Sequence, residues 1–189
     1  MDRFTLGPTC VGIVQLGDIT KLTVDVIVNA ANERMLGGLG VDGAIHIWAG
    51  PALQAACREV PEIRPGVRCP RGEARITPGF ELPCDYVIHT VGPIYDSQAT
   101  SAHVLDSAYR STLGLANQYG LRTIAFPAIS CGAYGYPLDE AASVAIKCCR
   151  THYGKLEQIH FVLYEQEHYE CWLTVAEELL GSRTPMIES

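Results

Sequence analysis

No apolar run in the 189-residue sequence approaches the roughly 20 residues that a transmembrane helix needs, so we expect no membrane-spanning segment. Residues 1–5 lack a basic start followed by an apolar stretch, and we expect no secretory signal. Charged residues make up only 19% of the chain, against 48% hydrophobic residues, and this composition excludes intrinsic disorder. The length suits one domain, which we expect over residues 1–181, with a flexible tail over 182–189.

Basic residues are also few, with 14 Lys and Arg against 21 Asp and Glu and a formal net charge of -7. We do not expect such a chain to bind nucleic acid, because the phosphate backbone is bound mainly through positive charge. An anionic ligand would have to be held by local backbone donors. We expect a monomer in the cytoplasm, with entry into the nucleus left open.

The eight cysteines include no Cys-x-x-Cys pair, and no His-x-x-x-His accompanies them, so we expect no metal site. Without a visible signal peptide, we interpret the thiols as small buried apolar groups in a reducing compartment. Cys131 lies in a glycine-rich loop, where a nucleophile would fit, but no base for it can be identified. Ser130 is not part of a Gly-x-Ser-x-Gly motif, which excludes an α/β-hydrolase elbow.

Strand and helix patterns alternate along the chain. Apolar and β-branched stretches predict strands at 11–16, 24–28, 75–77, 86–91, 123–126 and 159–164. Helical spacing of apolar residues predicts helices at 41–48, 52–59, 104–119, 138–150 and 169–180. The alternation predicts an α/β fold in which helices cover both faces of a mostly parallel sheet.

Two glycine-rich loops, residues 29–42 and 127–137, each connect a predicted strand to a predicted helix. Glycine lets backbone N–H groups approach an anion, and a helix N-terminus adds positive partial charge. We therefore favour a diphosphate clamp over the alternative that the glycines serve only tight turns. Residues 38–43 match G-x-G-x-x-G, but a polar loop separates them from the strand, so we do not interpret them as a dinucleotide fingerprint.

Four polar residues in or just after the first loop could have a functional or a structural role. Asp42 could polarise water or hold a ribose hydroxyl, or it could only complement the helix dipole. His46 lies one turn further along the same helix face and could be a structural histidine. Asn29 and Asn32 bracket the end of the buried strand, where an amide can bind backbone groups as well as a ligand.

Five separated motifs, at residues 17–20, 28–32, 37–46, 87–93 and 126–137, closely resemble the macrodomain family. The resemblance is strongest to the MacroD-type branch, which includes bacterial O-acetyl-ADP-ribose deacetylases. It runs in order from about Val11 to Tyr164. It implies a three-layer α/β/α fold with a mixed, mostly parallel sheet and an ADP-ribose cleft across the strand ends.

The resemblance also implies roles for individual residues. Asp18 would accept a hydrogen bond from the adenine amine, with Ile19 beside the base and Tyr164 against its ring. The catalytic candidates are Asp42, Asn32 and His46. The expected ligand-binding residues are Asp18, Ile19, Asn32, Gly37, Gly38, Leu39, Gly40, Val41, Asp42, Ser130, Cys131, Gly132, Ala133, Tyr134 and Tyr164.

The implied activity is hydrolysis of an ester at the distal ribose, without a cofactor. It would remove mono-ADP-ribose from Asp or Glu side chains of proteins and deacetylate O-acetyl-ADP-ribose. Leu39 departs from the pattern, because this stretch is usually all glycine in MacroD-type enzymes, and Ile47-Trp48 replaces a more usual basic-small pair. The alternative is therefore a reader that binds ADP-ribose, with turnover weakened by Leu39. Whether Asp42 removes a proton or only holds the ribose stays open.

Overall fold

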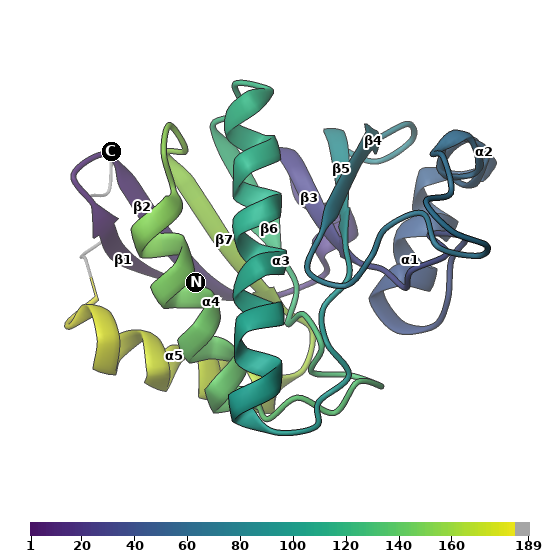
Figure 1. The fold of residues 1–189 in the computed structure, drawn as a ribbon. Coiled ribbons are helices and arrows are strands. Elements are labelled where there is room, and N and C mark those ends of the chain that lie inside the picture. The colour runs from purple at the N-terminus through teal and green to yellow at the C-terminus, as the bar shows by residue number, and fades with distance from the viewer. Residues whose placement is uncertain (184–189) are drawn as a thin grey trace.

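A seven-stranded sheet forms the middle layer of the computed structural model, which describes residues 1–183 (Figure 1). The strands are β1 (Asp2–Gly7), β2 (Cys10–Leu16), β3 (Val24–Ala30), β4 (Ala74–Pro78), β5 (Cys84–Thr90), β6 (Thr123–Phe126) and β7 (Gln158–Leu163). Their order is β1-β2-β7-β6-β3-β5-β4. The inner strands are parallel, whereas β1 and β4 are antiparallel edges. The mixed, mostly parallel sheet is confirmed.

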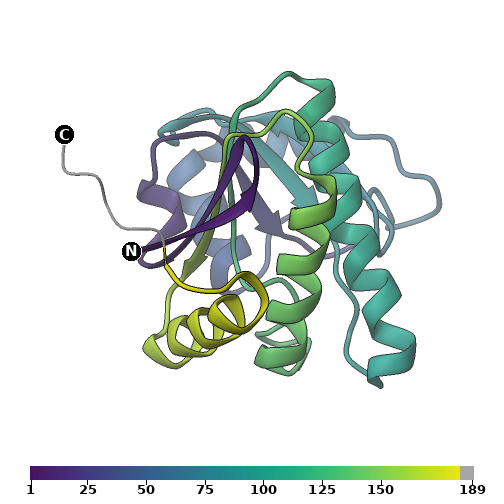
Figure 2. The ribbon, with the colours of Figure 1, turned by 90° about the vertical axis from the view of Figure 1, so that its left-hand side faces the viewer.

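Helices cover both faces of this sheet, which confirms the three-layer α/β/α fold. They are α1 (Gly40–Ala49), α2 (Pro51–Glu59), α3 (Gln98–Gln118), α4 (Leu138–His152) and α5 (Gln166–Leu180), with a short 3-10 helix η1 (Ile19–Lys21) after β2. The first two α-helices bury one face of the sheet, and α3, α4 and α5 bury the other (Figures 1 and 2). Within residues 1–183, no helix is long and apolar enough to cross a bilayer.

All six predicted strands are present, but β1 was missed. Only Phe4 and Leu6 of this strand are buried, and polar residues alternate with them, as expected for an edge strand that pairs on one side. The third helix begins at Gln98 rather than at 104, because the Ser97 hydroxyl caps it through Thr100 N. The predicted tail from residue 184 onward lies outside the described residues.

The parallel strands bring the two glycine-rich loops to one edge of the sheet. β3 and β6 are neighbours, and each continues from its carboxyl end into one loop. The carboxyl ends of β2 and β7, at Leu16 and Leu163, lie at the same edge. Ligands of open α/β sheets bind at such an edge.

Two histidines are buried within strands. His89 of β5 is fully buried, and His160 of β7 is 7% exposed. Burial lowers the pKa of His89 to about 3 and that of His160 to about 4, and nearby His46 and Arg3 act in the same direction. Both are therefore neutral in the folded protein at neutral pH.

The two depressed pKa values predict that acid destabilises the fold. Above about pH 6.5, the ordinary pKa of histidine, folding involves no proton release from these side chains. As pH falls below that value, these histidines bind protons in the unfolded chain but not in the folded chain. The free energy of unfolding therefore falls by up to about 1.4 kcal/mol per pH unit for each histidine.

This is measured by urea unfolding between about pH 7 and about pH 5. We expect His160→Gln to lose less free energy of unfolding on acidification than the parent. His103→Gln, which alters an exposed histidine, should follow the parent. Equal losses in the parent and His160→Gln would contradict the prediction.

Candidate functional site

A cleft of about 500 Å³ lies at the carboxyl edge of the sheet. Its walls come from residues 17–20, from one face of α1, from the start of the loop after β6 and from residues 162–168. Of the predicted ligand-binding residues, six line it: Asp18, Ile19, Gly40, Val41, Gly132 and Tyr164. The two glycine-rich loops thus face one cleft.

One end of the cleft is apolar and aromatic. Ile19 is buried, whereas Tyr164, which follows the neighbouring strand β7, is 81% exposed. Asp18 caps η1 with Oδ1, which accepts from Thr20 N at 2.9 Å and from Thr20 Oγ1 at 2.7 Å. Its second carboxylate oxygen makes no hydrogen bond to the described residues and is available to a donor on a ligand.

Trp48 adds a second aromatic surface to this end. It lies on the same face of α1 as Val41 and Ala44 and lines the cleft, with half of its surface exposed. Lys21 Nζ lies 2.8 Å from the centroid of the Trp48 ring, so a cation–π contact holds the indole. The sequence marked Trp48 only as a departure from the family pattern, not as a ligand residue.

The loop after β6 lines the cleft with Pro127, Ala128 and Gly132 and contains backbone N–H groups that its turns do not use. Its turns use the N–H groups of Ile129, Cys131, Gly135 and Tyr136. The N–H groups of residues 130 and 132–134 have no backbone partner within residues 1–183. Together with the free N–H groups in the first turn of α1, they form a surface suited to an anion.

Ser130 shapes this loop. Its φ of 67° lies in the left-handed region, which costs a non-glycine residue roughly 1–2 kcal/mol. Its side chain is 7% exposed and faces Gly92, where a Cβ atom would collide with Ser130 Oγ and Ile129. The loop therefore depends on the absence of a side chain at Gly92.

The loop after β3 is closed by Asn32. Its Nδ2 donates to the carbonyl oxygen of Gly37 at 3.2 Å, and its Oδ1 accepts from the N–H of Arg34 at 3.1 Å. Met35, also with a positive φ (59°), is fully buried beneath the loop. Both interpretations of Asn32 remain compatible with this geometry, because one N–H of its amide is still available to a ligand.

Asp42 lies directly under this loop and is only 4% exposed. Its Oδ1 accepts a 2.7 Å hydrogen bond from Asn29 Nδ2. Its Oδ2 faces Gly38, where a Cβ atom would lie 3.0 Å from Oδ2 and 3.4 Å from Asn32 Nδ2. Burial raises the pKa of Asp42, whereas the hydrogen bond from Asn29 and the charge of His46 lower it. The structure thus brings Asn32 and Asp42 together around Gly38.

His46 supports this region without a hydrogen bond of its own within the described part of the chain. Its Nε2 lies 3.5 Å from Asp42 Oδ1, and its ring lies beside Gly37. The role of His46 in the site stays a prediction. Its position favours an electrostatic role next to the Asp42 carboxylate.

The other nine predicted ligand residues do not line the cleft: Asn32, Gly37, Gly38, Leu39, Asp42, Ser130, Cys131, Ala133 and Tyr134. Leu39 is 95% exposed, so its side chain projects into solvent and does not fill the cleft. Cys131 precedes Gly132 in the loop after β6, and Ala133 and Tyr134 follow it. Burial raises the pKa of the Cys131 thiol to about 12, which argues against a nucleophilic thiolate.

Two residues behind Asp42 were not assigned a role from the sequence. Asn29 contacts Asp42 directly, and His89 contacts Asn29. A polar side chain near the end of an apolar strand was the available signal for both. Their contact depends on strand pairing, which the sequence pattern does not specify.

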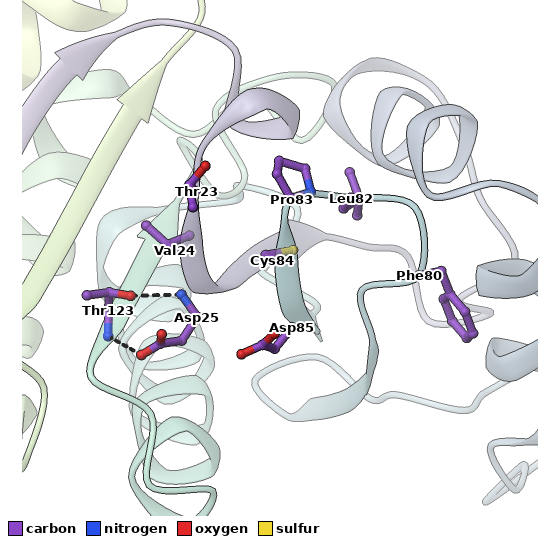
Figure 3. Close-up of a pocket in the computed structure, with 9 residues that line it drawn as sticks. All are labelled: Thr23, Val24, Asp25, Phe80, Leu82, Pro83, Cys84, Asp85 and Thr123. Carbon is purple, nitrogen blue, oxygen red and sulfur yellow. Dashed lines mark hydrogen bonds between the residues drawn. The ribbon is translucent and has the colours of Figure 1, made fainter.

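A second hollow, of about 470 Å³, opens at the opposite edge of the sheet (Figure 3). The Asp25 carboxylate accepts from the N–H groups of Arg122 and Thr123, and Asp25 N donates to Thr123 Oγ1. These bonds tie β3 to the start of β6. We interpret this hollow as structural.

The chain is similar to known macrodomains in sequence and in structure. The Macro domain family model matches residues 28–145. A macro domain-containing protein of Xanthomonas campestris is 60% identical over 131 residues, which are 69% of this chain and 73% of that protein. An O-acetyl-ADP-ribose deacetylase of Klebsiella pneumoniae is 51% identical over 158 residues, covering 82% and 89%. The solved Oceanobacillus iheyensis macrodomain with ADP is 40% identical and covers 94% and 95%, with a TM-score of 0.87.

The contact between Gly92 and Ser130 yields a stability prediction. We expect Gly92→Ala to lower the free energy of unfolding by roughly 1–3 kcal/mol, because the added methyl group collides with the Ser130 loop. Gly114→Ala, in α3, is the matched control. It meets no atom within 4 Å and should raise stability by roughly 0.5–1 kcal/mol. Urea unfolding measures both, and a neutral Gly92→Ala would show that the loop is not held this tightly.

Proposed function

The chain belongs to the Macro domain family, and on this premise we propose that it binds ADP-ribose in the cleft and hydrolyses esters at the distal ribose. The proposed substrates are O-acetyl-ADP-ribose and proteins that carry mono-ADP-ribose on Asp or Glu side chains. Water adds across the ester bond, which yields a carboxylic acid and a free ribose hydroxyl. The observation that carries this proposal is the buried Asp42 carboxylate, which converges with Asn32 on Gly38.

The proposed diphosphate position is between the two glycine-rich loops. Gly132 and Gly40 line the cleft from the two loops. The N–H groups of residues 132–134 have no backbone partner within residues 1–183, and α1 begins at Gly40. These donors are fixed parts of the backbone. They allow a chain of net charge -7 to bind an anion without a cluster of basic side chains.

The proposed adenine position is at the aromatic end of the cleft. Asp18 accepts from the adenine amine with its free oxygen, and Ile19 lies beside the base. Tyr164 and Trp48 supply two aromatic surfaces. Base–aromatic stacking contributes roughly 1–3 kcal/mol per base. The distal ribose then extends toward Gly38, Asn32 and Asp42.

Ester hydrolysis needs little further machinery, because the ester is already an activated bond. Holding a water near the reacting carbon and stabilising the developing charge supplies most of the rate enhancement. Asp42 accepts a hydrogen bond from that water or from a ribose hydroxyl, and in either role it acts as the carboxylate. Asn32 uses its remaining N–H to hold a distal ribose hydroxyl.

The relatives named as O-acetyl-ADP-ribose deacetylases support an enzyme rather than a reader. A reader was proposed because Leu39 interrupts the glycine run. Since the Leu39 side chain points into solvent, no contact in the cleft favours the reader. A protein that binds ADP-ribose but does not cleave it from a modified protein would nevertheless be a reader.

We expect Asp42→Ala to retain much of the binding of free ADP-ribose and to lose most of the hydrolysis, because Asp42 acts at the ester rather than at the base or diphosphate. Time-resolved release of ADP-ribose from a protein modified on Glu side chains measures hydrolysis, and calorimetry measures binding. Asp106→Asn, which removes a surface carboxylate paired with Arg110, should match the parent in both assays. Release by Asp42→Ala at the parent rate would refute the assignment.

We expect Trp48→Ala to weaken ADP-ribose binding by roughly 5- to 100-fold, because the base loses one aromatic surface. Ile47→Ala is the matched control, because Ile47 is 76% exposed on the same helix and does not line the cleft. It should bind as the parent does. Equal affinities in all three proteins, measured by calorimetry, would remove Trp48 from the adenine site.

A further inference from the structure

A row of buried polar side chains runs sideways from Asp42 into the sheet. Asn29 Nδ2 lies 2.7 Å from Asp42 Oδ1 and 3.1 Å from His89 Nδ1. His89 Nε2 lies 2.9 Å from Thr77 Oγ1. All four side chains are at most 5% exposed, and Asn29 and His89 are completely buried. The row links α1 to three adjacent strands, β3, β5 and β4.

Strand register brings these residues together. Asn29 and His89 are direct partners in the parallel pairing of β3 with β5. Both lie on the face that α1 and α2 cover, because Ile27 and Val87, two residues earlier on each strand, belong to the core on that side. Thr77 is opposite Val87 on β4, which places it diagonally next to His89.

The protons of this row can be assigned from its acceptors. His89 stays neutral because burial lowers its pKa to about 3. Its Nδ1 accepts from Asn29, so the ring proton is on Nε2 and is donated to Thr77 Oγ1. With the Asp42 carboxylate on one side and His89 Nδ1 on the other, only the NH2 end of the Asn29 amide fits between them.

We propose that Asn29 and His89 are positioning residues that hold Asp42 by Oδ1, so that Oδ2 stays directed at Gly38 and Asn32, where the distal ribose is proposed to bind. This inference rests on the proposed function. His89 does not touch Asp42 or the substrate. It acts by fixing the orientation of the Asn29 amide, whose two N–H groups then serve Asp42 and His89.

Other ionisable groups near Asp42 have to be considered in any pH measurement. His46 approaches Oδ1 from the same helix, at 3.5 Å. Cys57 of α2 contacts His89 at 3.7 Å, and burial raises the pKa of its thiol to about 12, so it stays neutral. The charge of Arg68 acts on Cys57 from the loop before β4. His46 is unchanged in all the variants below.

The first test is Asn29→Ala, assayed for ester hydrolysis across a pH range. Loss of the N–H donor removes a bond that favours the Asp42 carboxylate. We therefore expect kcat to fall by roughly 10- to 100-fold, with KM changed by only a few-fold, and the acid limb of the profile to move to higher pH. Carbon-13 NMR of the Asp42 carboxyl group, assigned with Asp42→Asn, should show the same upward shift without any need for turnover.

A pair of His89 variants separates positioning from packing. His89→Asn places a carbonyl oxygen near the position of Nδ1 and keeps an acceptor for Asn29, whereas His89→Leu removes it. Both lose the contact with Thr77. We expect His89→Leu to shift the Asp42 titration upward as Asn29→Ala does, and His89→Asn to return it toward the parent value.

Thr112→Val is the control for loss of a buried hydrogen bond elsewhere, because Thr112 is fully buried in α3 and donates to the carbonyl oxygen of Ala108. It should lower stability without moving the titration. Unshifted Asp42 titration in Asn29→Ala and His89→Leu, or equal shifts in the two His89 variants, would overturn the inference. A parent protein that lacks hydrolysis would refute the proposed function instead, and the NMR titration would still decide whether Asn29 and His89 hold Asp42.

Discussion

The hydrogen bond from Asn29 to Asp42 determines how the parts of this site fit together. A carboxylate that is 4% exposed is stable as an anion only if donors surround it, and Asn29 donates from the neighbouring strand. This bond fixes the rotation of α1 relative to β3. The loop between them then passes over Asp42, and a Cβ atom at position 38 would lie only 3.0 Å from Asp42 Oδ2. Burial of one charged group thus sets the shape of the proposed catalytic end.

The rest of the cleft follows from the same geometry. When α1 is fixed by Asp42, its N-terminus faces the loop after β6, and the Val41–Trp48 face of the helix forms one wall of the cleft. Backbone N–H groups supply positive potential at short range, whereas the net charge of -7 acts over longer distances and is screened by salt. The overall negative charge therefore weakens the proposed binding of an anion at these donors only slightly.

The sequence was sufficient for the fold and for the two loops, but not for the contacts between strands. β-branched stretches such as Val24–Val28 predict buried parallel strands, because both of their faces must be apolar. The role of Asn29 could not be predicted, because it depends on the register that places His89 beside it. The edge strand β1 was missed because an edge that pairs on one side needs few apolar residues. The sequence marked Trp48 only as a departure from the family pattern, because its position in the cleft depends on the orientation of α1.

Backbone strain in the two loops indicates that their surroundings fix their conformations. Met35 and Ser130 both have left-handed backbone conformations, one in each loop. Each costs roughly 1–2 kcal/mol, so each must be enforced by its surroundings. Met35 is fixed by complete burial in the core under α1, and Ser130 by its tight fit against Gly92. Because the core enforces both conformations, the loops are held in shape before any ligand arrives. Binding then requires little additional ordering of the chain, and the intrinsic affinity of the backbone donors is retained.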